Sequence, residues 1–365
     1  SFRLPAQVLD DEVGRIIGLG VGTRFGERVD SLKALIDEGF DAVFIGTGAP
    51  RGKDLAIPGR SEAGAHLQLG IDFLTSVAFR HLDSIGKRVV VIGGGNTAMD
   101  CCRTALRLGA EEVTVTVRSP RADMKASEWE IEDAEREGIP ILDNHSPKEI
   151  VVEDGRVKAV VFDRMRAVYA PDGSRQLELT GEDPVVIECD DVLMAVGQEN
   201  AFPWIERNIG LEFDERDHPV VDEATFASTL DGVFFGGDAA LGPKNIIWAV
   251  AHGHQAAISI DLYCQGNSLT DRPPAMSSLI SQKMGIHEWS YDNEVSPEER
   301  LQVPVVANEV ALRDISVEVE LGFDPLQALA EAQRCLNCDI QTVFEDKLCI
   351  ECDSCMDICP VDCIN

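Results

Sequence analysis

The fold class is decided by residues 87–118, which read KRVVVIGGGNTAMDCCRTALRLGAEEVTVTVR. The apolar run from Val89 to Ile92 is typical of a buried parallel strand, and three glycines follow it directly. Residues 96–108 then carry a helical periodicity that ends at Gly109. A strand, a glycine turn and a helix in this order predict a dinucleotide-binding fold.

The spacing of the small residues within this turn fits such a fold. Gly93 permits the sharp turn, Gly95 lets the backbone approach a pyrophosphate, and the small side chain of Ala98 lets the helix pack on the strand. The backbone N–H groups at Asn96 and Thr97 would then meet the phosphate charge. A purely structural glycine turn is the alternative, and the strand and helix predicted on either side favour nucleotide binding over it.

The end of the next predicted strand, residues 112–117, bears on which nucleotide binds. A site for NAD would place an acidic residue there, whereas this chain has Arg118, Ser119, Pro120 and Arg121. Two guanidinium groups suit a 2′-phosphate, so the sequence favours NADP(H) over NAD(H). The alternative, in which both arginines are solvated surface residues, stays open.

Two further stretches read as the parts of one interrupted domain. FDAVFIGTGAP at residues 40–50 is an apolar strand that runs into a turn of small residues. DGVFFGGDAALGPKNIIWAVAHGHQAA at residues 231–257 is a strand, a Gly-Gly-Asp turn and a helix. The nucleotide domain is inserted between them, and alternating apolar residues at 148–190 predict hairpin strands within that domain.

The C-terminal stretch CIECDSCMDICPVDCIN, residues 349–365, is the ligand run of a bacterial ferredoxin. Seven of the eleven cysteines lie between residues 335 and 365, which points to metal ligation rather than a disulfide framework. In two-cluster ferredoxins the last cysteine of a run ligates the other cluster, so a ligand from elsewhere is needed. The expected ligands are Cys349, Cys352, Cys355 and Cys359, with Cys335, Cys338 and Cys363 or residues beyond the end as further candidates.

The remaining cysteines and two histidines have plain interpretations. Cys101 and Cys102 are adjacent on the predicted helix, where they cannot easily form a redox-active bridge, so we expect small buried side chains. Cys189 and Cys264 are expected in the core. For His252 and His254, packing or solvent exposure is favoured over catalysis.

The bulk composition excludes some classes of function. The 365 residues carry a formal net charge of -32, which disfavours binding to a phosphate backbone. This charge fits solubility, a salty habitat or an acidic docking face for a basic partner, and charge alone does not decide among them. No run of about 18 apolar residues reads as a membrane span, and no signal peptide opens the chain, so a cytoplasmic protein is expected.

The turns GTG at residues 46–48 and AVG at residues 195–197, the GGGNTAMDCCRTALRLGA stretch and GGDAA together resemble a known family. They are similar to flavoproteins of the pyridine nucleotide-disulphide oxidoreductase superfamily, specifically the glutamate synthase small-subunit type. The reductase portion of dihydropyrimidine dehydrogenase is built alike, as is the large subunit of NADH-dependent ferredoxin:NADP oxidoreductases. The resemblance implies an α/β chain with two Rossmann-like dinucleotide-binding domains, the NADP domain inserted in the FAD domain, and a small ferredoxin-like module at the C-terminal end.

The resemblance also implies a site for FAD. Asp238 would hold the ribityl chain, and the helix that starts near Asn245 and Ile246 would aim its positive end at the N1/O2 edge of the flavin. The other residues implied are Gly46, Thr47, Gly48, Gly197 and Gly237. A mere surface turn at Gly-Gly-Asp is the alternative. Hydride transfer between nicotinamide and flavin needs apposition rather than a protein acid or base, so no catalytic residue is expected.

The expected organisation has five parts. They are residues 1–82 and 201–264 for the FAD domain, 83–200 for the NAD(P) domain, 265–330 for a linker, and 331–365 for a [4Fe-4S] domain. The linker reads as an extended connector with short helices, one of them at residues 325–332 behind Asp324 as a helix cap. Because the family's first FAD fingerprint would precede Phe2, and because the cysteine run has an unfinished ligand count, we expect a fragment incomplete at both ends.

These features predict an enzyme that moves electrons between NADP(H), FAD and [4Fe-4S] clusters. The expected partner is a ferredoxin or an oxidoreductase subunit, such as a 2-oxoacid:ferredoxin oxidoreductase. One alternative is the small subunit of glutamate synthase, which would feed the large subunit. A scaffold that only carries clusters is an alternative of another class, and the retention of both nucleotide turns speaks against it.

Overall fold

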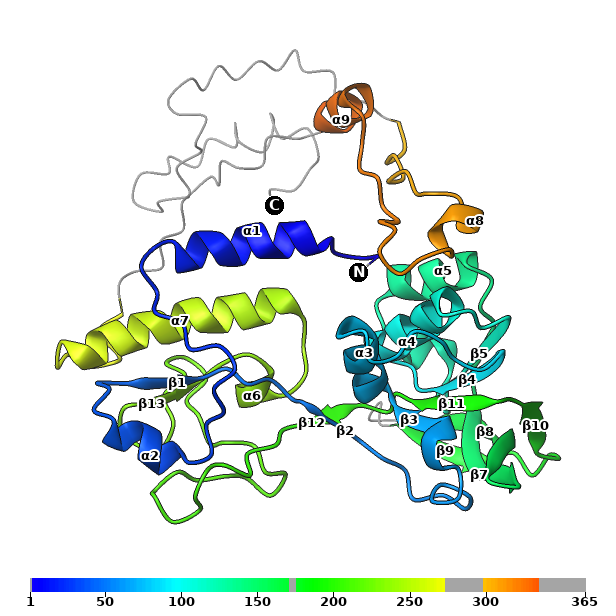
Figure 1. The fold of residues 1–365 in the computed structure, drawn as a ribbon, viewed down its shortest axis with the longest axis horizontal. Helices are drawn as coiled ribbons and strands as arrows, with labels where there is room; N and C mark the ends of the chain where they lie inside the picture. The colour runs from blue at the N-terminus through cyan, green and yellow to red at the C-terminus, as the bar shows by residue number, and fades with distance from the viewer. Residues whose placement is uncertain (1, 171–174, 273–297, 335–365) are drawn as a thin grey trace, which may run out of the picture. The chain divides into compact units, whose positions relative to one another are not determined.

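The computed structural model describes residues 2–170, 175–272 and 298–334. These residues fall into two compact units (Figure 1). The first lies within Ser1–Arg272 and Val305–Glu320, and the second within Pro273–Pro304 and Leu321–Asn365.

A five-stranded parallel sheet is the centre of the nucleotide-binding half of the first unit. Its strand order is β3 (Leu67–Leu69), β11 (Asp191–Met194), β4 (Arg88–Ile92), β5 (Glu112–Thr116) and β6 (Ile141–Leu142). The strand predicted at residues 89–92 is therefore the middle strand β4, and it is buried. The predicted helix at residues 96–108 is α4 (Asn96–Arg107). An α/β fold with Rossmann-type topology is confirmed.

Different layers cover the two faces of this sheet. Because successive residues of a strand point to opposite faces, Val89 and Val91 of β4 pack on one side and Val90 and Ile92 on the other. The first side is covered by α3 (Gly70–Ala78), α4 and α5 (Glu128–Arg136). The second side is covered by an antiparallel sheet of β7 (His145–Glu153), β8 (Arg156–Tyr169), β9 (Arg175–Leu179) and β10 (Val185–Glu188).

The predicted hairpin strands at residues 148–190 are this antiparallel sheet. The turn between β7 and β8 has positive φ angles of 51° at Asp154 and 73° at Gly155. Two adjacent residues in this conformation match the right-handed twist of the strands they join. The hairpin predicted from the alternating apolar residues is therefore confirmed, and the Glu-Asp-Gly sequence at residues 153–155 forms its turn.

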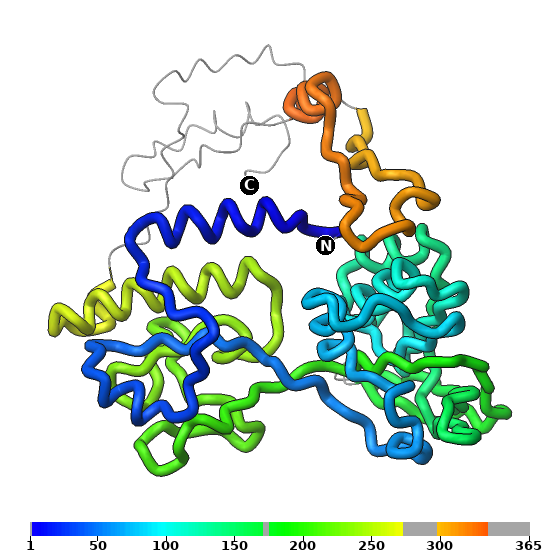
Figure 2. The backbone as a smooth tube through the Cα atoms, viewed as in Figure 1, coloured from blue at the N-terminus to red at the C-terminus, as the bar shows by residue number. Residues whose placement is uncertain are grey.

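The two stretches that the sequence assigns to one interrupted domain contribute strands that pair with each other. β1 (Val43–Ile45) and β13 (Val233–Phe235) form a two-stranded parallel sheet, with α2 (Leu32–Asp37), α6 (Asp238–Leu241) and α7 (Ile246–Cys264) around it. Leu32, Phe202 and Phe235 belong to the core of this half. The chain passes from this half to the nucleotide-binding half through β2 (Arg51–Gly52) and comes back through β12 (Gln198–Glu199). These two strands pair antiparallel, and Figure 2 shows the two segments side by side.

Residues 305–320, which the sequence assigns to a linker, are anchored to the nucleotide-binding half. The backbone N–H of Val306 donates to Val319, and that of Val319 donates to Phe2. The Phe2 ring lies 3.9 Å from the guanidinium carbon of Arg107 and 5.0 Å from that of Arg103, both on α4. The segment therefore packs against Phe2, which in turn contacts α4, and it includes the short helix α8 (Asn308–Ala311).

Four further elements complete the described part of the two units. In the first unit, α1 (Ala6–Ile17) follows Phe2, and the one-turn helix η1 (Gly64–His66) precedes β3. A second one-turn helix, η2 (Arg121–Asp123), lies between β5 and α5. In the second unit, α9 (Pro325–Ala332) begins at Asp324, whose carboxylate accepts hydrogen bonds from the N–H groups of Leu326 and Gln327. The predicted cap is thus confirmed. In the part of the chain that the structure describes, no helix is both long and apolar enough to cross a membrane.

The cysteine predictions have mixed outcomes. Cys101, Cys102 and Cys189 are buried, as expected. The prediction for Cys264 is wrong, because this residue is exposed. The buried residues of α7 are His252, Ala256 and Ser259, and Cys264 falls off the face that this spacing defines.

Candidate nucleotide and flavin sites

The first glycine of the turn after β4 is required by the fold itself. Gly93 has a φ of 146°, and a Cβ placed there would lie 2.1 Å from the carbonyl oxygen of Ala195. Its N–H donates to the carbonyl of Thr116 at 3.0 Å. The turn is therefore clamped between the ends of β5 and β11.

No protein contact explains the glycine at position 95. Gly95 has an unstrained φ of -106°, and no heavy atom of the described chain lies within 4 Å of a Cβ built there. It is the N-cap of α4, whose first N–H groups have no acceptor within the helix. An open backbone surface beside these donors fits a phosphate group that approaches the turn closely. Ala98, one turn further on, is fully buried in the core, as the fingerprint predicts.

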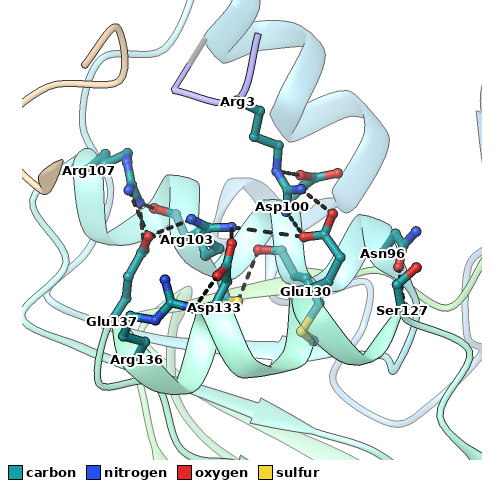
Figure 3. A network of polar contacts seen from close by, with 12 residues as sticks. Arg3, Asn96, Asp100, Arg103, Arg107, Ser127, Glu130, Asp133, Arg136 and Glu137 are labelled. Atoms are coloured by element: carbon teal, nitrogen blue, oxygen red, sulfur yellow. Dashed lines mark hydrogen bonds and ion pairs between the residues drawn. The ribbon is translucent and has the colours of Figure 1, made fainter. Parts of the chain in front are cut away.

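The loop after β5, residues 118–127, folds over this turn. The N–H groups of Lys125 and Ala126 both donate to the carbonyl of Gly94 at 3.0 Å. The N–H of Ser127, the N-cap of α5, donates to Oδ1 of Asn96 at 2.9 Å (Figure 3). The Asn96 side chain therefore ties the start of α5 to the start of α4, a role that the sequence did not predict.

The cations of this loop have different surroundings. Arg118 and Lys125 are both exposed. Among the described residues, neither side chain has a hydrogen bond or an ion pair. Arg121 instead makes a bidentate pair with Glu135 and lies 3.6 Å from Glu128, on the exposed face of α5. Within the described residues, Arg118 is therefore available to bind an anion, whereas Arg121 is already engaged by α5.

Lys125 was missed by the sequence reasoning. A positive residue between β5 and α5 was a visible signal, but its link to the glycine turn depends on the hydrogen bonds to Gly94. Those bonds join residues that are far apart in the chain, so only the structure shows them.

Behind this loop lies a buried charge network on α4 and α5 (Figure 3). Glu137 accepts hydrogen bonds from Arg103 at 2.8 and 3.0 Å and from Arg107 at 2.7 and 2.9 Å. Burial would raise the pKa of Glu137, but the two guanidinium groups outweigh that effect and lower it. Arg3 bridges Asp100 and Glu130 in the same network. The network holds the two helices whose starts frame the glycine turn.

In the other half, two turns meet at the carboxyl ends of β1 and β13. The N–H of Gly236 donates to the carbonyl of Ile45 at 3.1 Å, so residues 46–48 and 236–238 are adjacent. Gly48 has a φ of 73° and Gly237 a φ of 61°, values that favour glycine. The carboxyl ends of parallel strands are where α/β folds bind ligands.

Asp238 and Asn245 both have structural partners. Oδ1 of Asp238 accepts a hydrogen bond from the N–H of Lys244 at 3.0 Å. Oδ1 of Asn245 accepts one from the N–H of Trp248 at 3.1 Å and so caps α7. Ile246, Ile247 and Trp248 in the first turn of α7 are at least half exposed. The helix start predicted at Asn245 is correct, and an apolar side chain surface lies beside it.

Two buried polar atoms near these turns lack a partner among the described residues. They are Oδ1 of Asn200 and Nδ1 of His252. The amide of Asn200 donates to the carbonyl of Ala239 in α6, and the His252 ring packs 4.6 Å from that of Phe226. Buried polar atoms without a partner are uncommon, so this half fits completion by a polar ligand such as a flavin. His252 is buried by packing and His254 is exposed, as expected.

Other predicted residues lie elsewhere. Gly197 has a φ of 122° and accepts a hydrogen bond from Lys53, where β11 leads into β12. The seven cysteines predicted to ligate clusters, at positions 335, 338, 349, 352, 355, 359 and 363, lie outside the described residues. Among the residues that are described, no group of three or more potential ligands could hold a metal ion.

Comparisons with known proteins agree with this architecture. The chain is 34% identical to NADP(+)-dependent formate dehydrogenase subunit beta of Moorella thermoacetica, over 93% of this chain and 48% of the relative. It is 33% identical to NADPH-Fe(3+) oxidoreductase subunit beta of Geobacter sulfurreducens, over 92% and 54%. It is 34% identical to the glutamate synthase [NADPH] small chain of Halomonas elongata, over 71% and 58%. The chain thus spans about half the length of these relatives.

The chain is also similar to a solved structure and matches a family model. FprA from Mycobacterium tuberculosis in complex with NADPH aligns with a TM-score of 0.50 at 20% identity, over 64% of this chain and 65% of that one. This likeness is one of fold. The model for pyridine nucleotide-disulphide oxidoreductases matches residues 28–253, more than half of the chain. As the resemblance predicted, this chain belongs to the pyridine nucleotide-disulphide oxidoreductase family.

Proposed function

We propose that this chain moves electrons between NADP(H), FAD and [4Fe-4S] clusters, to or from a ferredoxin or a partner oxidoreductase subunit. The observation that carries the proposal is the glycine turn, where Gly95 has no contact that requires glycine and unpaired cations follow on the adjoining loop. The names of the three relatives above each include NADP or NADPH, which supports NADP(H) over NAD(H) as the nucleotide.

The proposed nucleotide site consists of Gly93, Gly95, the helix start at residues 96–98, and the loop cations. The N–H groups at the start of α4 would receive the pyrophosphate. Arg118 would receive the 2′-phosphate, and Lys125 adds a third positive charge to the same loop. An exposed arginine without a protein partner is suited to a dianionic group, because no existing ion pair has to break.

The proposed flavin site consists of residues 46–48, Gly197, residues 237–238 and residues 245–246. The left-handed glycines let the backbone come close to the cofactor, the free oxygen of the Asp238 carboxylate would accept from a ribityl hydroxyl, and the start of α7 supplies a positive dipole end. FAD, when bound, would supply the exchange between two-electron and one-electron chemistry.

The cysteines between residues 335 and 365 would hold the [4Fe-4S] clusters, which carry single electrons. We retain the domain boundaries expected from the sequence, with residues 305–320 of the linker packed on the NAD(P) domain. Candidate partners are a ferredoxin, a 2-oxoacid:ferredoxin oxidoreductase or another oxidoreductase subunit. Because relatives are called subunits of a formate dehydrogenase and of an Fe(3+) oxidoreductase, a partner subunit is favoured.

A second candidate is the small chain of glutamate synthase. The likeness to the chain of that name from Halomonas elongata favours it. The cysteine run at the C-terminal side of this sequence favours the first proposal, because the resemblance places the cysteine-rich region of the small subunit at its N-terminal side.

The test is reduction of an artificial electron acceptor by NADPH, measured on the full protein with FAD supplied and its iron content determined. We expect NADPH-dependent dye reduction that exceeds the rate with NADH. Asp238→Ala is expected to lower flavin content, while nucleotide binding is kept. Protein that holds iron and flavin yet reduces no dye with either nucleotide would leave the scaffold alternative standing.

A further inference from the structure

We propose that Glu135 is a positioning residue for nucleotide selectivity: it holds Arg121 in an ion pair that NADP(H) must displace and that NAD(H) leaves intact. This inference rests on the proposed function, because it assumes that the 2′-phosphate binds at the loop after β5. It goes further in assigning a selectivity role to an acidic residue outside the fingerprint.

The contacts of Arg121 show how it is held. Nη1 and Nη2 of its guanidinium donate to Oε1 and Oε2 of Glu135, the second bond at 2.9 Å. Nη2 also lies 3.6 Å from Oε1 of Glu128. The backbone N–H of Arg121 donates to Asp143 at 2.9 Å, which fixes the base of the side chain. The two guanidinium nitrogens that could bind a phosphate in a bidentate manner are thus already hydrogen-bonded to a carboxylate.

The held arginine remains within the same loop as the free cations. Glu128 and Glu135 lie two turns apart on α5, so their side chains share one face of the helix. Glu128 directly follows Ser127, which is tied to Asn96 at the start of α4. The guanidinium of Arg121 therefore lies on a face of α5 that leads from Glu135 past Glu128 toward the glycine turn.

The ion pair between Arg121 and Glu135 is weak enough for a phosphate group to replace the carboxylate. The side chains of Arg121 and Glu135 are 39% and 43% exposed, and exposed pairs are weak. A 2′-phosphate offers more charge and the same bidentate geometry, so it can displace the carboxylate. NAD(H) has no such group and leaves the pair closed. Glu135 therefore lowers the affinity for NADP(H) and not that for NAD(H).

The experiment measures nucleotide affinity by calorimetry on the full protein, with NADP⁺ and NAD⁺ as the ligands. Glu135→Gln is expected to tighten NADP⁺ binding by about two- to fivefold and to leave NAD⁺ binding unchanged. Glu132→Gln is the matched control, because Glu132 is exposed on the same helix and has no hydrogen bond or ion pair among the described residues. It changes the net charge equally, so it should reproduce none of the selectivity effect.

A double-mutant cycle separates this role from a general change of charge. In an Arg121→Ala background, Glu135→Gln should have no effect on NADP⁺ affinity, because Glu135 acts through Arg121. The proposal is overturned if Glu135→Gln weakens NADP⁺ binding, if it shifts both nucleotides equally, or if its effect persists without Arg121. Failure of the unsubstituted protein to prefer NADP⁺ at all would instead refute the proposed function, so the two failures are distinguishable.

Discussion

The carbonyl oxygen of Ala195 occupies the space where a side chain at Gly93 would begin. A Cβ on Gly93 would lie 2.1 Å from that oxygen, and the φ of 146° is itself strained for any other residue. Gly95, two positions later, has neither constraint. One glycine of the fingerprint therefore serves the fold, and the other is left to serve a ligand.

This difference predicts that replacement by alanine mainly affects stability at Gly93 and mainly affects nucleotide binding at Gly95. Gly93→Ala should destabilise the protein by about 3 kcal/mol or more, because backbone must move to relieve the clash. Gly95→Ala should destabilise the protein by only about 1 kcal/mol or less, the cost of alanine at a helix N-cap. It should still weaken nucleotide binding at least tenfold, since the methyl group fills the open space beside the turn. Chemical denaturation and nucleotide titration of both variants provide the check. Unchanged nucleotide affinity in Gly95→Ala would remove the main support for the site.

The free cations predict how nucleotide preference responds to charge removal. Arg118→Ala should weaken NADPH binding much more than NADH binding, by about tenfold or more, because one charge-assisted contact to the 2′-phosphate is lost. Lys125→Ala should act in the same direction if its ammonium group reaches that phosphate, and on both nucleotides alike if it reaches the pyrophosphate. Dissociation constants for both nucleotides give the answer. Equal losses in Arg118→Ala would contradict the 2′-phosphate assignment.

The lowered pKa of Glu137 predicts that the protein loses stability as the pH becomes acidic. A carboxyl group whose pKa is lowered in the folded state stabilises the protein above its ordinary pKa near 4.5, and this stabilisation is lost as the pH falls through the folded-state value. Glu137→Gln should cost about 3 kcal/mol at pH 7, because it leaves Arg103 and Arg107 buried without a countercharge. The difference from the unsubstituted protein should shrink below pH 4.5. Urea denaturation at several pH values measures it, with Glu132→Gln as an exposed control.

The cysteines of the described residues should differ sharply in reactivity. Burial raises the pKa of Cys102 and of Cys189 to about 12, and burial raises that of Cys101 well above its ordinary value. At pH 8 a thiol with that pKa is only about 10⁻⁴ ionised, so these residues should resist alkylation. Cys264 is exposed and should be labelled in the native protein. Peptide mapping after brief iodoacetamide treatment tests this, and rapid labelling of Cys101 or Cys102 would contradict the packing of α4.

Local patterns in the sequence predicted much of the fold. The strand at residues 89–92, the helix at 96–108, the hairpin at Asp154 and Gly155 and the cap at Asp324 all depend on residues close together in the chain. Such elements are specified by side chain periodicity and by turn chemistry, which a sequence displays directly. The sequence also assigned the stretches that hold β1 and β13 to one domain, and the structure adds that the two strands pair.

The sequence by itself therefore determined many of the strands, turns and helices, the family, and the kinds of residue proposed to face a nucleotide. Only the tertiary structure decided which long side chains are already engaged. Arg118 and Arg121 look equivalent in the sequence. Among the described residues, however, Arg118 has no side chain partner, whereas Arg121 is held by Glu135, on a helix that begins after both. In the same way, Cys264 is exposed, and residues 305–320 pack against Phe2, whose ring contacts α4. The physical reason is that ion pairs and burial depend on contacts between distant segments, whereas backbone conformation is specified mostly by near neighbours.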